Sequence, residues 1–179
     1  MIFYNISMVL EPLLLVEKPK KILEISMYTS SGCRYGRLAK DCQKRAWGME
    51  IETFTDRIDV EEKLGSDGHT EPYRRVLSLE ALDRPQELED YDMILVADLL
   101  EHLDVDTAKA LVLELCSKAK NQVLVIAPDI DLEETIFQSK KIKYFKTEKV
   151  EAEPESVRIY SVSCNSTFMQ RIQEERTCS

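Results

Sequence analysis

The chain has 179 residues, of which 44% are hydrophobic and 32% are charged, and its formal net charge is -9. This length and apolar content suit one domain with a hydrophobic core and exclude a wholly disordered chain. Because a field of that sign repels phosphate backbones, the charge also argues against a dedicated nucleic-acid binder. Only 5 residues are glycine, so any loop that holds a phosphate or a cofactor must be built from few of them.

Nothing in the sequence predicts a membrane segment or a secretory signal. The most apolar early stretch, 8–16, is interrupted by Glu11 and Pro12 and is shorter than the roughly 20 apolar residues that span a bilayer. It lacks the basic region of a signal peptide, so we expect a short packing helix there. These features predict a cytoplasmic protein without a membrane partner.

The cysteine pattern argues against a metal site. The sequence contains no C-x-x-C pair, and no histidine lies at metal-ligand spacing from a cysteine. We therefore expect free thiols in a reducing compartment and no bound metal. The five cysteines are Cys33, Cys42, Cys116, Cys164 and Cys178.

Short apolar runs alternate with amphipathic stretches along the chain, which predicts alternating strands and helices. The expected strands are, in chain order, 20–26, 49–54, 75–79, 92–97, 123–127, 144–150 and 156–164. The expected helices are 2–16, 33–47, 56–64, one that Asp104 or Asp106 caps, and 132–140. The helix after residue 104 is the clearest, because Glu114 and Lys118 pair at i, i+4 beside an apolar stripe. That stripe consists of Ala108, Leu111, Val112, Leu115 and Ala119.

Strand–helix alternation followed by a terminal hairpin predicts an α/β fold. Right-handed crossovers place helices on both faces of such a sheet, which makes it doubly wound, Rossmann-like and mostly parallel. We expect 1–165 to form a single domain and 166–179 to be a polar, ragged tail. Ligands in these sheets bind outside the carboxyl ends of the strands, so we expect the site residues there.

The first two strand ends each offer one candidate. After the first strand, Gly32 lies in a loop that enters the helix at 33–47, whose free N–H groups favour an anion. Gly32 is equally consistent with a simple turn. At the second strand, Glu50 is placed to accept both hydroxyls of a ribose, and Glu52 is the competing candidate. The alternative for Glu50 is an exposed strand carboxylate.

The end of the fourth strand bears a denser polar group. Asp98, Glu101 and His102 follow the buried run directly. Histidine titrates near neutral pH, so this group is suited to proton transfer if a reacting group comes within reach. The alternative for His102 is a residue at a helix start that is bonded only to the backbone.

Together these segments resemble the class I S-adenosylmethionine-dependent methyltransferases over nearly the whole chain. The sharpest match is 91–103, YDMILVADLLEHL, which is similar to the fourth motif of that family. The resemblance implies a seven-stranded sheet that ends in an antiparallel hairpin. It also implies a cofactor site made of Glu24, Ser26, Gly32, Glu50, Ile51, Ser78, Leu79, Asp98 and Leu99.

The resemblance implies transfer of a methyl group from S-adenosylmethionine to a small-molecule acceptor. The (D/N)PPY string of the branch that methylates amino groups of nucleic acids is absent here. Positioning of the two reactants would supply most of the catalysis, with His102 or Glu101 as the proton acceptor. Because 1–17 is a small lid, we expect an open site, or one covered by a second copy or a protein partner.

Three departures from the family pattern support a second hypothesis. Ser26 stands where the first motif has its first glycine, Ser78 replaces the acid beside the adenine, and Asn121 replaces a later glycine. At the two glycine positions a Cβ restricts the approach of backbone to a ligand, and Ser78 lacks the acceptor that the acid provides for the exocyclic amine of the adenine. The alternative is therefore a methyltransferase-fold protein without activity that serves as a binding or scaffold module.

Overall fold

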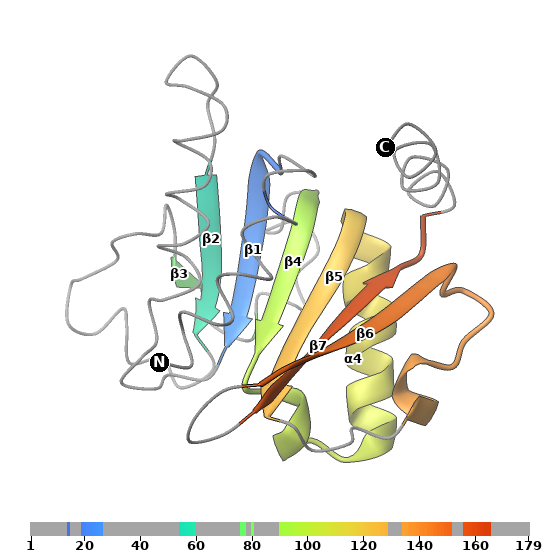
Figure 1. The fold of residues 1–179 in the computed structure, drawn as a ribbon. Helices are drawn as coiled ribbons and strands as arrows, with labels where there is room; N and C mark the ends of the chain where they lie inside the picture. Colours follow the sequence, from blue (N-terminus) through green and yellow to red (C-terminus); the bar gives the residue numbers. More distant parts are fainter. Residues whose placement is uncertain are drawn as a thin grey trace, which may run out of the picture.

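The computed structural model describes residues 14, 19–26, 54–59, 76–77, 80, 90–128, 134–151 and 156–165. Their strands form one sheet in the order β3-β2-β1-β4-β5-β7-β6 (Figure 1). Neighbours are parallel from β3 to β5, whereas β7 is antiparallel to both β5 and β6. The α/β class and the mixed sheet are therefore confirmed. The strands are β1 (Lys21–Ser26), β2 (Phe54–Asp59), β3 (Val76–Leu77), β4 (Tyr91–Ala97), β5 (Ala119–Pro128), β6 (Tyr144–Val150) and β7 (Val157–Ser163).

The strand order reverses between β1 and β4. From β1 the chain builds outward through β2 and β3, and from β4 it builds in the opposite direction through β5. A reversal of this kind leaves a crevice at the carboxyl ends of the two strands that flank it. Ser26 and Ala97, the last residues of β1 and β4, are aligned partners at this place.

β1 and β4 are buried on both faces, as the continuous apolar run of β4 after Asp92 predicts for that strand. Alternate side chains enter two separate core clusters. Leu23 and Val96 belong to the cluster on the side of α4 (Val105–Lys118). Ile22 and Leu95 belong to the cluster on the other side. The central strands thus form the middle layer of the domain.

α4 begins as the sequence predicts. Asp104 is its N-cap, and the Asp104 carboxylate accepts hydrogen bonds from Thr107 N at 3.0 Å and from Thr107 Oγ1 at 2.6 Å. These bonds satisfy a backbone donor that the first turn would leave free. Of the two caps considered, Asp104 is correct, and Asp106 lies in the first turn.

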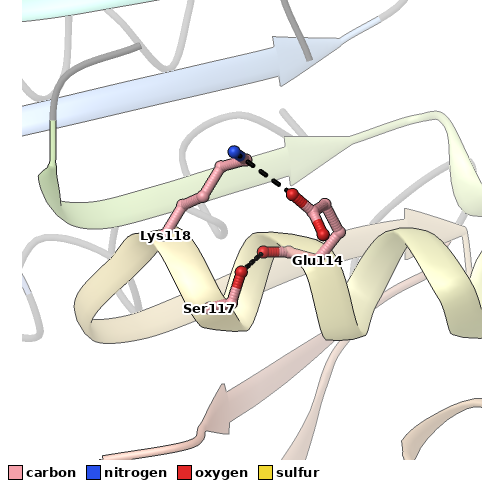
Figure 2. Close-up of polar contacts among 3 residues, drawn as sticks. All are labelled: Glu114, Ser117 and Lys118. Atoms are coloured by element: carbon pink, nitrogen blue, oxygen red, sulfur yellow. Dashed lines mark hydrogen bonds and ion pairs between the residues drawn. The ribbon is translucent and has the colours of Figure 1, made fainter. Parts of the chain in front are cut away.

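The two sides of α4 differ as its periodicity requires. Leu115 is fully buried and Leu111 packs against the same cluster, so the predicted apolar face does cover the sheet. On the polar side the predicted ion pair is present, with Lys118 Nζ at 3.1 Å from Glu114 Oε1 (Figure 2). Ser117 Oγ donates to the Glu114 carbonyl oxygen at 2.6 Å in the same turn (Figure 2).

The opposite face of the sheet is described in part. Leu14 has helical backbone, is 1% exposed and belongs to the cluster on that face. The other residues of the helix expected at 2–16 lie outside the described residues. The helix expected at 33–47 and the tail 166–179 lie outside the described residues.

β2 corrects the sequence prediction. β2 covers Phe54–Asp59, so the helix expected at 56–64 is wrong over the residues that belong to β2, whereas residues 49–53 of the strand expected at 49–54 lie outside the described residues. Ile58 is fully buried in the cluster under α4. The local pattern fits either structure, and pairing with β1 and β3 decides between them.

Two later elements also differ from expectation. A short 3-10 helix, η4 (Glu134–Phe137), stands in the region where a longer helix was expected at 132–140. β5 begins at Ala119, which was assigned to the helix stripe, so α4 continues into β5 without a loop. Ala119 pairs with Tyr91 of β4, and this contact stabilises extended backbone there.

Candidate functional site

The candidate site lies at the carboxyl ends of β1, β2 and β4. Ser26 is aligned with Asp59 of β2 on one side and with Ala97 of β4 on the other. Asp98 follows Ala97 directly. Three strands that are separated in sequence therefore bring polar residues to one edge, as expected for a wound sheet.

Glu24 and Ser26 form a buried polar pair in β1. Glu24 is 0% exposed and Ser26 is 3% exposed. Ser26 Oγ donates a hydrogen bond to Glu24 Oε1 at 3.0 Å. Since a buried carboxylate is costly without hydrogen bonds, the Ser26 hydroxyl stabilises Glu24 in this position.

Asp98 has an unusual backbone conformation. Its φ is 52°, in the left-handed region, and it is the one non-glycine residue with positive φ in the described part of the chain. Asp98 N still donates to Ile126 O at 3.1 Å, so the chain turns while it remains bonded to β5. Such conformations cost about 1–3 kcal/mol and cluster at functional sites.

A short 3-10 helix, η3 (Leu100–His102), then fixes the chain that leaves β4. Leu99 is 5% exposed, Leu100 is 1% exposed, and both belong to the core cluster under α4. His102 N donates to Leu99 O at 3.1 Å and closes the turn. The buried leucines therefore anchor the segment that presents Asp98, Glu101 and His102.

Burial shapes the acid–base properties of this segment. Burial raises the pKa of Asp98, and the nearby His102 opposes this rise. Burial likewise raises the pKa of Glu101; the Asp98 charge adds to the rise, and a backbone hydrogen bond and His102 oppose it. Glu101 Oε2 is buried without a hydrogen-bond partner, whereas His102 is exposed. Perturbed carboxyl groups at a strand end are typical of functional sites.

The structure brings together some of the predicted site residues. Glu24, Ser26, Asp98 and Leu99 of the predicted cofactor set lie at or beside this edge, together with Glu101 and His102. The others lie outside the described residues. They are Gly32, Glu50, Ile51, Ser78 and Leu79.

The acid at the end of β2 was not among the predicted site residues. Glu50 was chosen as a strand-end acid, but it precedes β2 in the sequence, as does the competing Glu52. The last residue of β2 is Asp59, aligned with Ser26. The sequence contains one signal for a strand that ends at Asp59, because Asp59 directly follows the buried Ile58. The burial of Ile58 was not predicted, because its neighbours in the sequence are charged.

Two further expectations were checked on the described residues. Within 90–128 and the other described ranges, no group of three or more His, Cys, Asp or Glu side chains is arranged to hold a metal ion. In the same part of the chain, every helix is too short or too polar to cross a membrane.

No family model matches the sequence, and no curated protein matches it either. Solved structures do match. Magnesium protoporphyrin IX methyltransferase from Synechocystis PCC 6803, with bound S-adenosylmethionine, has a TM-score of 0.57 at 14% identity over 90% of this chain and 80% of that chain.

Two other structures match to a similar degree. An S-adenosylmethionine-dependent methyltransferase from Archaeoglobus fulgidus has a TM-score of 0.57 at 16% identity, over 88% of this chain and 94% of that one. Human N-acetylserotonin methyltransferase, in complex with S-adenosylmethionine, has a TM-score of 0.58 at 14% identity, over 89% of this chain and 51% of that one. The chain therefore resembles the S-adenosylmethionine-dependent methyltransferases in its fold, and the resemblance seen in the sequence is confirmed at that level.

Proposed function

We propose that the protein binds S-adenosylmethionine at the carboxyl ends of β1, β2 and β4 and transfers its methyl group to a small-molecule acceptor. The observation that supports this proposal is the alignment of Ser26 with Asp59 and Ala97 at the reversal of strand order. Nucleotide-like ligands bind at this position in wound sheets. The enzyme domain would comprise 1–165, with helices on both faces of a seven-stranded sheet and 1–17 as a lid.

Asp59 is the residue proposed to bind the ribose of the cofactor. A carboxylate at the end of the second strand of a wound sheet can accept hydrogen bonds from ribose hydroxyls. Asp59 occupies the end of β2, and Glu50 comes before that strand begins. We therefore propose Asp59 for this role and use Glu50 as the comparison residue.

The rest of the cofactor site follows the family resemblance. Glu24 and Ser26 form the end of β1 beside the cofactor, and Asp98 and Leu99 form the end of β4. Gly32 follows β1 in the sequence. Ile51, Ser78 and Leu79 stay in the proposed site on the resemblance alone.

Glu101 is proposed as the proton acceptor. S-adenosylmethionine, when bound, supplies a methyl group on a sulfonium, and the acceptor nucleophile that takes the methyl group releases a proton. Glu101 Oε2 is buried without a hydrogen-bond partner, and burial raises the pKa of this carboxyl group toward the range useful for proton transfer. His102 is exposed and lies in the same turn, so it is the second candidate for this proton.

Calorimetric titration with S-adenosylhomocysteine tests the cofactor site. We expect binding in the micromolar range or weaker. Asp59→Ala should weaken it at least tenfold, about 1.4 kcal/mol, by removing the acceptor for the ribose hydroxyls. Glu50→Ala, a matched loss of one carboxylate, should change the affinity less than twofold. Absence of binding by the unaltered chain would overturn the proposal.

A binding module without catalysis is the second candidate function. The hydroxyl of Ser26 is bonded to Glu24 inside the sheet, and Ser26 is almost fully buried where the family has a glycine. A ligand can therefore approach the backbone less closely at this position than it could at a glycine. S-adenosylhomocysteine binding without methyl transfer to any acceptor in a broad small-molecule panel would favour this candidate, with a second copy or a protein as the partner.

A further inference from the structure

Two cysteines lie at the end of the sheet opposite the candidate site, near the start of β5. Cys116 lies in the last part of α4 and is 4% exposed in the core cluster. Cys164 directly follows β7, is partly buried and packs against the same cluster. Both are free thiols, and neither takes part in the proposed methyl transfer.

The backbone around Cys164 is held in place on both sides. Ser163 Oγ donates to Asn121 O at the start of β5. Asn165 Nδ2 donates to Lys120 O at 2.7 Å. Since α4 continues directly into β5, these two bonds hold Cys164 against the end of the helix that contains Cys116.

The two sulfurs interact directly. A side-chain hydrogen bond joins Cys116 and Cys164. Burial raises the pKa of Cys116, and the charge of Cys164 and this hydrogen bond raise it further.

We propose that Cys116 and Cys164 form a reversible redox modification site, which a small disulfide such as oxidised glutathione closes to an intramolecular disulfide. Cys164 attacks first, because it is the more exposed of the two. Its thiolate bonds to one sulfur of oxidised glutathione, the glutathione S–S bond breaks, and one glutathione thiolate leaves.

The second step closes the bridge. Cys116 loses its proton, its sulfur bonds to Cys164 Sγ, and the second glutathione leaves as a thiolate. Two protein thiols are oxidised to one disulfide, one glutathione disulfide is reduced to two glutathiones, and the two protons pass to the leaving thiolates.

The test uses the full chain with oxidised glutathione. After the reaction, free thiols are alkylated and the protein is digested without reduction and mapped by mass spectrometry. We expect a peptide pair joined through Cys116 and Cys164, lighter by two hydrogens than the two reduced peptides, which dithiothreitol separates again. The number of thiols that can be alkylated in the denatured chain should fall by two.

Matched variants distinguish this pair from the other cysteines. Cys42→Ser should keep the cross-link, and Cys164→Ser should abolish it and leave Cys116 unmodified by glutathione in the folded chain. Cys116 and Cys164 remaining free thiols would contradict the proposal. So would either of them bridged to Cys33, Cys42 or Cys178. The readout is covalent and does not depend on methyl transfer, so it can fail or succeed independently of the proposed enzyme activity.

Discussion

The two ends of the parallel strands differ in how their polar groups are satisfied. At the amino ends, Asp92 Oδ2 accepts from Lys20 N at 2.8 Å and from Lys21 N at 3.0 Å, which ties β4 to the start of β1. At the carboxyl ends, Asp98 has positive φ and Glu101 Oε2 has no hydrogen-bond partner.

This difference suits two roles: the amino ends of the strands stabilise the sheet, and the carboxyl ends form the candidate site. Strain and unsatisfied polar atoms are retained where a ligand or a reaction uses them. The amino ends, where Asp92 accepts two backbone hydrogen bonds, hold the sheet together, and the carboxyl ends keep strain and an unsatisfied carboxylate oxygen. Gln122 Nε2, buried at the start of β5 without a partner, is the exception at the amino ends.

The largest effect is expected at the amino ends. Asp92→Ala removes the acceptor for two backbone N–H groups and should lower the free energy of unfolding by about 2 kcal/mol, measured by urea denaturation. Asp90→Ala is the matched control, since Asp90 is exposed, and it should change stability by less than about 0.5 kcal/mol. If the two substitutions lowered the free energy of unfolding equally, the proposed difference between the amino and carboxyl ends of the strands would be wrong.

A smaller effect of opposite sign is expected at Asp98. Asp98→Gly should raise the free energy of unfolding by about 1 kcal/mol, because glycine adopts positive φ without the steric cost of a Cβ. The same variant should weaken binding of S-adenosylhomocysteine. Asp98→Ala keeps the Cβ and removes the carboxylate, so it should lose affinity without the gain in stability. A destabilised Asp98→Gly variant would show that this backbone is not strained.

The smallest effect concerns pH. Burial raises the pKa of Glu101 in the folded chain, so the folded state holds this proton more tightly than the unfolded state does. The contribution of Glu101 to stability is therefore full below its unfolded pKa and is lost as pH rises through the folded pKa. Glu101→Gln should unfold at a higher urea concentration than the unaltered chain at pH 7, and the gap should narrow at pH 4. A gap that widens on acidification would reverse the sign of this effect.

The elements with strong local signals were predictable from the sequence. β4 contains a continuous apolar run after Asp92, and such runs are typical of strands covered on both faces, while β1 combines buried apolar residues with the buried Glu24 and Ser26. α4 has an N-cap and an i, i+4 ion pair at the expected residues. The acidic and histidine residues after β4 were predictable too, because they follow directly from a strand with clear bounds.

β2 was not predictable in the same way. Among its residues Ile58 is deeply buried, and its neighbours in the sequence are charged, so periodicity does not separate strand from helix there. The place of the strand depends on backbone pairing with β1, which is far away in the sequence. For the same reason Asp59, the acid at the end of β2, was not singled out, and Glu50, the acid chosen from the sequence, lies outside the described residues.

By itself, the sequence determined the class of fold, the segments of the central core and the polar group after β4, because these depend on hydrophobic patterning and capping within short stretches of chain. The tertiary structure alone decided the order of the strands, the alignment of Ser26 with Asp59 and the packing of Cys116 and Cys164 in one core cluster. These depend on which distant segments pair, and a long-range pairing leaves no local pattern in either partner.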